Sequence, residues 1–190
     1  MEVQATTEPL KMPLLGVAAA SWGFVGVALL LGRPIWSLSE LAFEPLVRLD
    51  LSLWQWGLYG LSVVLMAYSE GYKGFQRGFS PRVVARAFHL ARHPTLTRAL
   101  LAPFFCIGLF HASKKRLIVS WTLLTMIVAL VLTVRLLPYP YRNIIDAGVV
   151  VGLGWGLLAT ILMAARALHR GCAEGSPELP DGEAAPPPVA

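Results

Sequence analysis

Residues 70–93 read EGYKGFQRGFSPRVVARAFHLARH, a polar and basic stretch that separates two apolar parts of the chain. The flanking apolar residues come in long blocks, and the whole chain is 56% hydrophobic and only 14% charged. A soluble domain carries about 25% charged residues. The sequence therefore predicts an all-α integral membrane protein in which residues 70–93 lie outside the membrane-spanning segments.

Four apolar blocks extend outward from this stretch, and each approaches or exceeds the roughly 20 residues needed to cross a bilayer. They cover residues 12–31, 51–68, 117–137 and 144–168, within one predicted bundle over residues 12–170. The residues after the first block do not resemble a small-residue cleavage site, so we interpret it as a retained helix. Residues 1–11 form an N-terminal tail, and the proline- and acid-rich residues 171–190 are predicted to be disordered.

A shorter apolar block over residues 95–112, interrupted by Pro103, is either a re-entrant hairpin or a fifth helix. If it re-enters and the N-terminus is cytoplasmic, the outer side keeps only four of the 16 Lys and Arg residues: Arg33, Arg48, Arg135 and Arg142. A full crossing would instead place nine of the 16 inside and seven outside, with Lys114, Lys115 and Arg116 among those outside. The positive-inside rule thus favours four transmembrane helices, a re-entrant segment and two cytoplasmic termini in a cell (inner) membrane.

Within the basic stretch, residues 82–93 have the pattern of an amphipathic helix that lies in the membrane interface. Apolar side chains between Val83 and Ala91 share one face, and basic side chains share the opposite face. We expect the basic side chains to point outward and to bind anionic lipid headgroups or a partner. A topological anchor without selectivity is the alternative. The candidate residues are Lys73, Arg77, Arg82, Arg86, His89, Arg92 and His93.

Three glycines, Gly71, Gly74 and Gly78, precede this helix and permit tight backbone turns. With Lys73 and Arg77 they suggest a loop that holds a phosphate group, although no nucleotide-binding spacing is present.

Ionisable residues near the ends of the apolar blocks form a second candidate group. Asp146 follows Arg142 by four residues, so the two can pair along one helix, and Arg135 is another candidate partner. Glu70 has a similar position at the end of the second block. An ionisable group at membrane depth indicates function by default. A structural ion pair or a cap near the helix N-terminus is the competing interpretation.

Small residues recur along two of the predicted spans, a pattern that lets transmembrane helices approach closely. One stripe contains Gly148, Gly152 and Gly156, and the other contains Gly16, Ala20 and Gly23. We expect the two stripes to pack on each other within one chain, with a subunit interface as the alternative.

Recognisable catalytic motifs are absent, and His89 and His93 lack the further ligands that a metal site needs. We therefore expect no cofactor, no metal and no catalytic residue. The net charge of +5 comes from residues beside apolar spans, so we expect contact with membrane lipids rather than nucleic acid. The leading hypothesis is a structural, assembly or accessory role, as a homo-oligomer or with a partner subunit. The alternatives are a small transporter or channel for a solute or lipid, and a lipid-modifying enzyme that uses residues 70–93.

Overall fold

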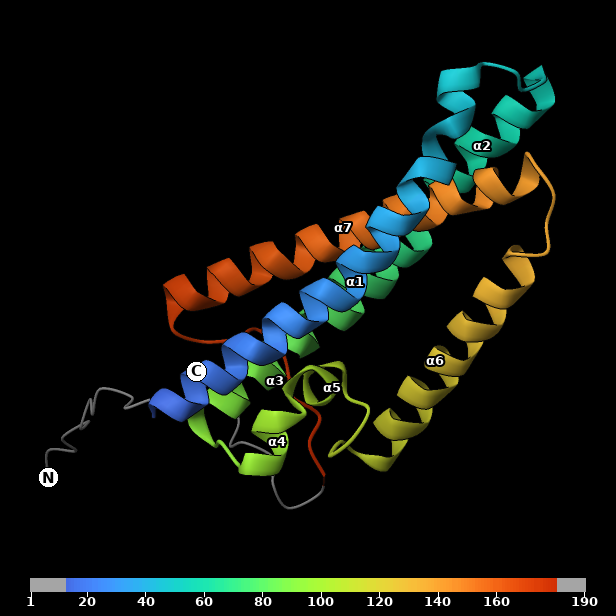
Figure 1. The fold of residues 1–190 in the computed structure, drawn as a ribbon. Coiled ribbons are helices and arrows are strands. Elements are labelled where there is room, and N and C mark those ends of the chain that lie inside the picture. The colour runs from blue at the N-terminus through green and yellow to red at the C-terminus, as the bar shows by residue number, and fades with distance from the viewer. Residues whose placement is uncertain (1–12, 181–190) are drawn as a thin grey trace, which may run out of the picture.

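The computed structural model describes residues 13–180, of which 82% are helical and none is in a strand. Four long helical runs alternate in direction, and two short helices join the second run to the third (Figure 1). This confirms the all-helical class. The predicted N-terminal tail and residues 181–190 of the predicted C-terminal tail lie outside the described residues.

Helix α1 (Leu14–Arg48) is 35 residues long and continues well beyond the apolar block that predicts it. Pro34 and Pro45 lie inside the helix, and it ends where Leu49 adopts a left-handed conformation with φ 53°. The amide of Leu49 donates to the carbonyl of Pro45, which satisfies one of the orphan acceptors of the last turn. Helix α2 (Leu53–Met66) then begins at a capping box made by Ser52 and Gln55.

Helix α2 passes without a break into the π-helix η1 (Ala67–Phe79) and then into α3 (Ser80–Arg92). A π-helix of 13 residues is unusual, because π geometry mostly occurs as single-turn bulges. The expected loop at Gly71, Gly74 and Gly78 is therefore wrong: the backbone stays helical. Gly71 lies against α7, where an added Cβ would come within 2.9 Å of the Cβ of Trp155.

Two short helices, α4 (Leu96–Leu100) and α5 (Ala102–Ile107), follow α3 and pack against α1. Arg92, just before this segment, donates to the carbonyl of Gly171 at 3.3 Å. Ser113, just after it, donates its amide to the carbonyl of Glu178 at 3.0 Å. The segment over residues 95–112 therefore starts and finishes at the same end of the structure.

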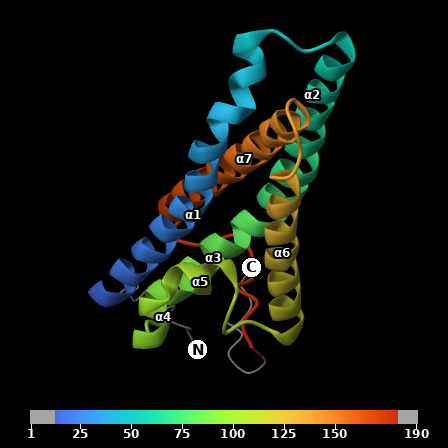
Figure 2. The ribbon, with the colours of Figure 1, turned by 45° about the vertical axis from the view of Figure 1, so that its right-hand side comes forward.

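Helix α6 (Lys114–Val134) runs away from this end, and α7 (Tyr141–Arg170) returns to it. Figure 1 shows α6 standing apart from the other long helices along most of its length, whereas in the turned view of Figure 2 its upper part overlaps the run of α2 and η1. Only Ser120 and Val134 are buried in α6. Near its start, Trp121 donates its indole Nε1 to the carbonyl of Leu109 at 3.1 Å.

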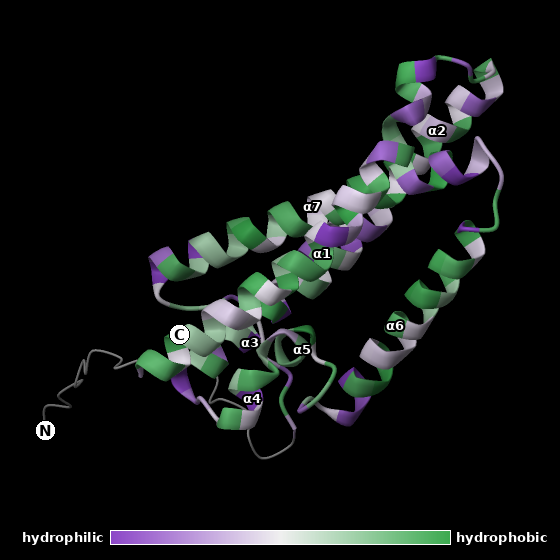
Figure 3. Ribbon diagram, viewed as in Figure 1, coloured by the Kyte–Doolittle hydropathy of each residue, from purple (hydrophilic) through white to green (hydrophobic). Residues whose placement is uncertain are grey.

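Three helices, α1, α6 and α7, are long and apolar enough to cross a membrane. Figure 3 shows α6 as mostly hydrophobic, with hydrophilic residues at its two ends. The predicted span at residues 51–68 is not among the three. Helix α2 has 14 residues, which cover about 21 Å of a core about 30 Å thick.

The two small-residue stripes do not pack on each other, so that prediction is wrong. Gly148, Gly152 and Gly156 of α7 face α2 and η1, where added Cβ atoms would approach Ser62, Glu70 and Phe75. Gly16 of α1 faces Ala91 of α3, and Gly23 faces Cys106 of α5. Ala20 is partly buried in the same apolar cluster. Each stripe lies against the run Leu53–Arg92 or the short helices, and α1 and α7 contact each other through other residues.

Residues 171–180, the described part of the predicted disordered tail, pack back onto the helices. Leu179 is buried in the apolar cluster that contains Val83, Leu90 and Phe105. We call α3, residues 94–113 and residues 171–180 together the cap.

Candidate functional site

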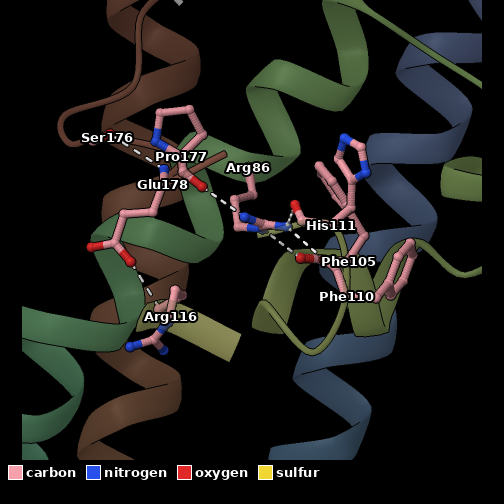
Figure 4. Close-up of polar contacts among 8 residues, drawn as sticks. All are labelled: Arg86, Phe105, Phe110, His111, Arg116, Ser176, Pro177 and Glu178. Atoms are coloured by element: carbon pink, nitrogen blue, oxygen red, sulfur yellow. Dashed lines mark hydrogen bonds and ion pairs between the residues drawn. The ribbon is translucent and has the colours of Figure 1, made fainter. Parts of the chain in front are cut away.

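Arg86 lies at the centre of the cap, and only 2% of its surface is exposed. Its guanidinium donates to four backbone carbonyl oxygens: Phe105 at 2.6 Å, Pro177 at 2.7 Å, His111 at 2.9 Å and Phe110 at 3.1 Å. The guanidinium carbon also lies 4.2 Å from the centre of the Phe105 ring. Figure 4 shows the side chain reaching between the α5 turn and the tail. One side chain thus joins three separate parts of the chain.

The charge of Arg86 is stabilised mainly by these carbonyl dipoles. Burial lowers the pKa of the Arg86 guanidinium to about 10, so the group stays charged at neutral pH. Cys106 is close, but burial raises the pKa of its thiol to about 12, so it is no counter-ion at neutral pH. Among the described residues, Glu178 is the carboxylate that acts on this charge.

Glu178 also acts on two further arginines, Arg82 of the cap and Arg116 at the start of α6. Its carboxylate lies 3.6 Å from Nε of Arg116 (Figure 4). Burial lowers the pKa of Arg82, the charge of Arg116 lowers it further, and Glu178 opposes both effects. Three arginines therefore share one carboxylate, so the cap has an excess of positive charge.

The prediction that α3 lies in the membrane interface with its basic face outward is wrong for Arg86 and His89. Both are buried, as are Val83, Ala87 and Ala91 on the expected apolar face. The amphipathic pattern is real, but protein covers both faces. The polar face of α3 packs on the α5 turn and the tail, which supply backbone acceptors in place of water.

The other basic candidates do not form one stripe. Lys73 and Arg77 are exposed on η1, and their charged groups lie over the rings of Tyr68 at 4.8 Å and Tyr72 at 4.7 Å. Arg92 and His93 are exposed at the far end of α3. The basic candidates therefore occupy three different environments: the exposed surface of η1, the exposed end of α3 and the buried positions of Arg86 and His89.

Asp146 lies buried in α7, with its Oδ2 3.5 Å from Nε of Arg142. The predicted pairing along one helix is therefore present. Arg135 is exposed at the end of α6, and no ion pair joins it to Asp146 among the described residues. Glu70 is half-buried against Gly152 of α7, in a separate place. These four polar residues therefore do not converge on one site.

The end opposite the cap is rich in carboxylates. Asn143 donates to Glu44 at 2.8 Å, and Arg48 pairs with Glu44 at 2.7 Å. Tyr139 donates to Asp50, and this hydrogen bond raises the pKa of its phenol. The structure therefore carries excess positive charge at the cap and mixed charge at the opposite end.

The sequence patterns missed the partners of Arg86, because those are backbone carbonyls. They also missed Arg166 and Arg170, which face a groove described below, although their spacing of four residues in the last turns of α7 is a visible signal. Within residues 13–180 no group of three or more His, Cys, Asp and Glu residues is placed to hold a metal. The chain matches no protein-family model, no curated protein and no solved structure at a significant level.

Proposed function

We propose that this protein is a multi-pass inner-membrane protein with a structural, assembly or accessory role. Its cap would present a basic surface to anionic lipid or to a partner on the cytoplasmic side. In this proposal α1, α6 and α7 cross the bilayer, and α2 with the start of η1 makes the fourth crossing. The segment over residues 95–112 re-enters, and both termini are cytoplasmic.

The observation that carries the proposal is the separation of charge between the two ends. Five basic residues are exposed at the cap end, whereas the opposite end holds the exposed Arg48 and Arg135 together with the carboxylates of Glu44 and Asp50. Exposed positive charge near a membrane favours the cytoplasmic side, where each basic residue contributes about 1 kcal/mol toward anionic lipid. The five are Arg92, Lys114, Lys115, Arg166 and Arg170.

Helix α6 supports the assembly part of the proposal. It is apolar all round and contacts its own chain mainly near its start, through Trp121 and Arg116. Lipid or a helix of another subunit has to cover the rest. Van der Waals packing is a leading force for helix association in lipid, so an exposed helix of this kind suits a subunit contact.

Two experiments test the proposal. A membrane-impermeant maleimide applied to intact cells should leave Lys115→Cys unlabelled in a Cys172→Ser background, and should label it after permeabilisation. Labelling from outside would contradict the proposed orientation. Purification in a mild detergent should recover a homo-oligomer or a stoichiometric partner, and a strictly monomeric protein with a measured turnover would contradict the assembly role.

A further inference from the structure

A groove runs along α7 beside η1 and α3. It consists of two adjoining cavities of about 170 Å³ and about 210 Å³, which share Met163 and Arg166 in their walls. Gln76 and Trp155 line one end, and Arg170 lines the other. We call this feature the α7 groove.

The two halves of the α7 groove differ in chemistry. Toward Trp155 the wall is apolar, and Leu158 and Leu162 remain 58% and 47% exposed. The indole of Trp155 donates to Gln76 at 2.8 Å, which leaves this end without a free donor from the ring. Toward the cap, the polar wall consists of Arg166, Arg170 and Glu174.

The basic half has a net positive charge. Arg170 pairs with Glu174, whereas Arg166 has no carboxylate partner among residues 13–180. Arg166 is exposed and lines both cavities, so its guanidinium is available where the apolar half meets the basic half. A guanidinium binds phosphate oxygens in a bidentate manner, which suits this position.

The length of the α7 groove matches one leaflet of a bilayer. From Trp155 to Arg166 the helix rises about 16 Å, and half of the hydrocarbon core is about 15 Å. An acyl chain beside Leu158 and Leu162 would therefore bring the headgroup of its lipid to the depth of Arg166. Basic pockets between transmembrane helices on the cytoplasmic side bind acidic headgroups.

We propose that the α7 groove binds one anionic phospholipid, with an acyl chain on its apolar half and the phosphate on Arg166. Arg170 is the second cation, and its pairing with Glu174 leaves Arg166 as the main contact. The inference rests on the proposed contact of the cap end with anionic lipid and names a site for it. None of the groove's basic residues belongs to the basic stretch that the sequence points to, which contributes Gln76, Pro81 and Val84 to the wall.

Native mass spectrometry of the full chain with equal amounts of phosphatidylglycerol and phosphatidylethanolamine tests the site. The wild type should retain one phosphatidylglycerol preferentially, and Arg166→Gln should weaken that retention about fivefold, the effect of one basic residue near anionic lipid. Lys115→Gln, which removes an exposed charge at the same end outside the α7 groove, should leave the retention unchanged. Leu162→Trp, which obstructs the apolar half and keeps every charge, should also weaken it. Size-exclusion profiles establish that each variant is folded.

The outcomes separate this inference from the proposed function. Equal losses of phosphatidylglycerol retention in Arg166→Gln and Lys115→Gln would overturn the α7 groove as the binding site and leave only a general preference for anionic lipid. No preference in the wild type would overturn the α7 groove and the contact of the cap end with anionic lipid, but not the assembly role. Displacement of the lipid by inorganic phosphate at millimolar concentration would overturn the assignment to a phospholipid, because a bound acyl chain gives the lipid an advantage that free phosphate lacks.

Discussion

Replacing Arg86 with methionine should destabilise the cap, because methionine keeps much of the side-chain volume and removes every donor. Four carbonyl oxygens, of Phe105, Pro177, Phe110 and His111, would lose their hydrogen bonds. At the lower limit of about 1.5 kcal/mol for a bond to a charged group, the four contribute about 6 kcal/mol. Burial of the charge opposes this, since a pKa lowered from 12.5 to about 10 corresponds to about 3 kcal/mol. The expected net loss is about 3 kcal/mol.

A loss of this size should lower the thermal midpoint by roughly 6 to 12 °C for a chain of this length. Scanning fluorimetry in detergent measures the midpoint, and hydrogen exchange should show faster exchange in residues 105–111 and 171–178. Arg77→Met is the control, because Arg77 is exposed and its guanidinium lies over the Tyr72 ring; it should cost no more than about 1 kcal/mol. Equal midpoints and equal exchange for Arg86→Met and Arg77→Met would refute the role of Arg86 in holding the cap together.

Four further outcomes follow from the same structure. Gly156→Ala should cost about 1 to 3 kcal/mol, because its Cβ would lie 2.3 Å from Cγ of Phe75; Gly154→Ala, with open space around its Cβ, should be neutral or stabilising in the same fluorimetry. Asp146→Asn should lower stability by about 1 kcal/mol, since Arg142 is partly exposed and can turn to water, and circular dichroism at rising temperature measures this. Asp146→Asn and Glu70→Gln should both leave the proton permeability of proteoliposomes at the wild-type level, and a clear change would favour the transporter alternative. Trp121→Phe should speed hydrogen exchange at residues 109–113, because it removes the donor to the carbonyl of Leu109.

Several features of the fold were predictable because they depend on local composition. Long apolar blocks give helices in any arrangement, so α1, α6 and α7 lie where the sequence expects them. The pairing of Arg142 with Asp146 follows from their spacing alone. The extension of α1 to Arg48 was not predicted, because charged residues and Pro45 normally indicate the end of an apolar helix.

For the candidate site, the sequence predicted which segment carries it but not the contacts that its side chains make. Periodicity correctly places Arg86 and His89 on the polar side of α3, but it carries no information about what covers that side. Water, lipid headgroups and backbone carbonyls can all accept the hydrogen bonds that a guanidinium donates. The carbonyls that contact Arg86 come from residues 19 to 91 positions away in the chain, so no local pattern reports them.

The sequence by itself determined that this chain is helical, that much of its surface suits a membrane and that its positive charge gathers around residues 70–116, because these properties depend on residue type and order. Only the tertiary structure decided that Arg86 and His89 of the basic stretch are buried, with Arg86 held by four carbonyls, while other basic residues, Arg166 among them, stay exposed. The physical reason is that a helical period specifies which side chains share a face. The neighbour that each face meets depends on how distant segments fold back, and here α5 and residues 171–180 take the place beside α3 that the sequence assigns to the membrane surface.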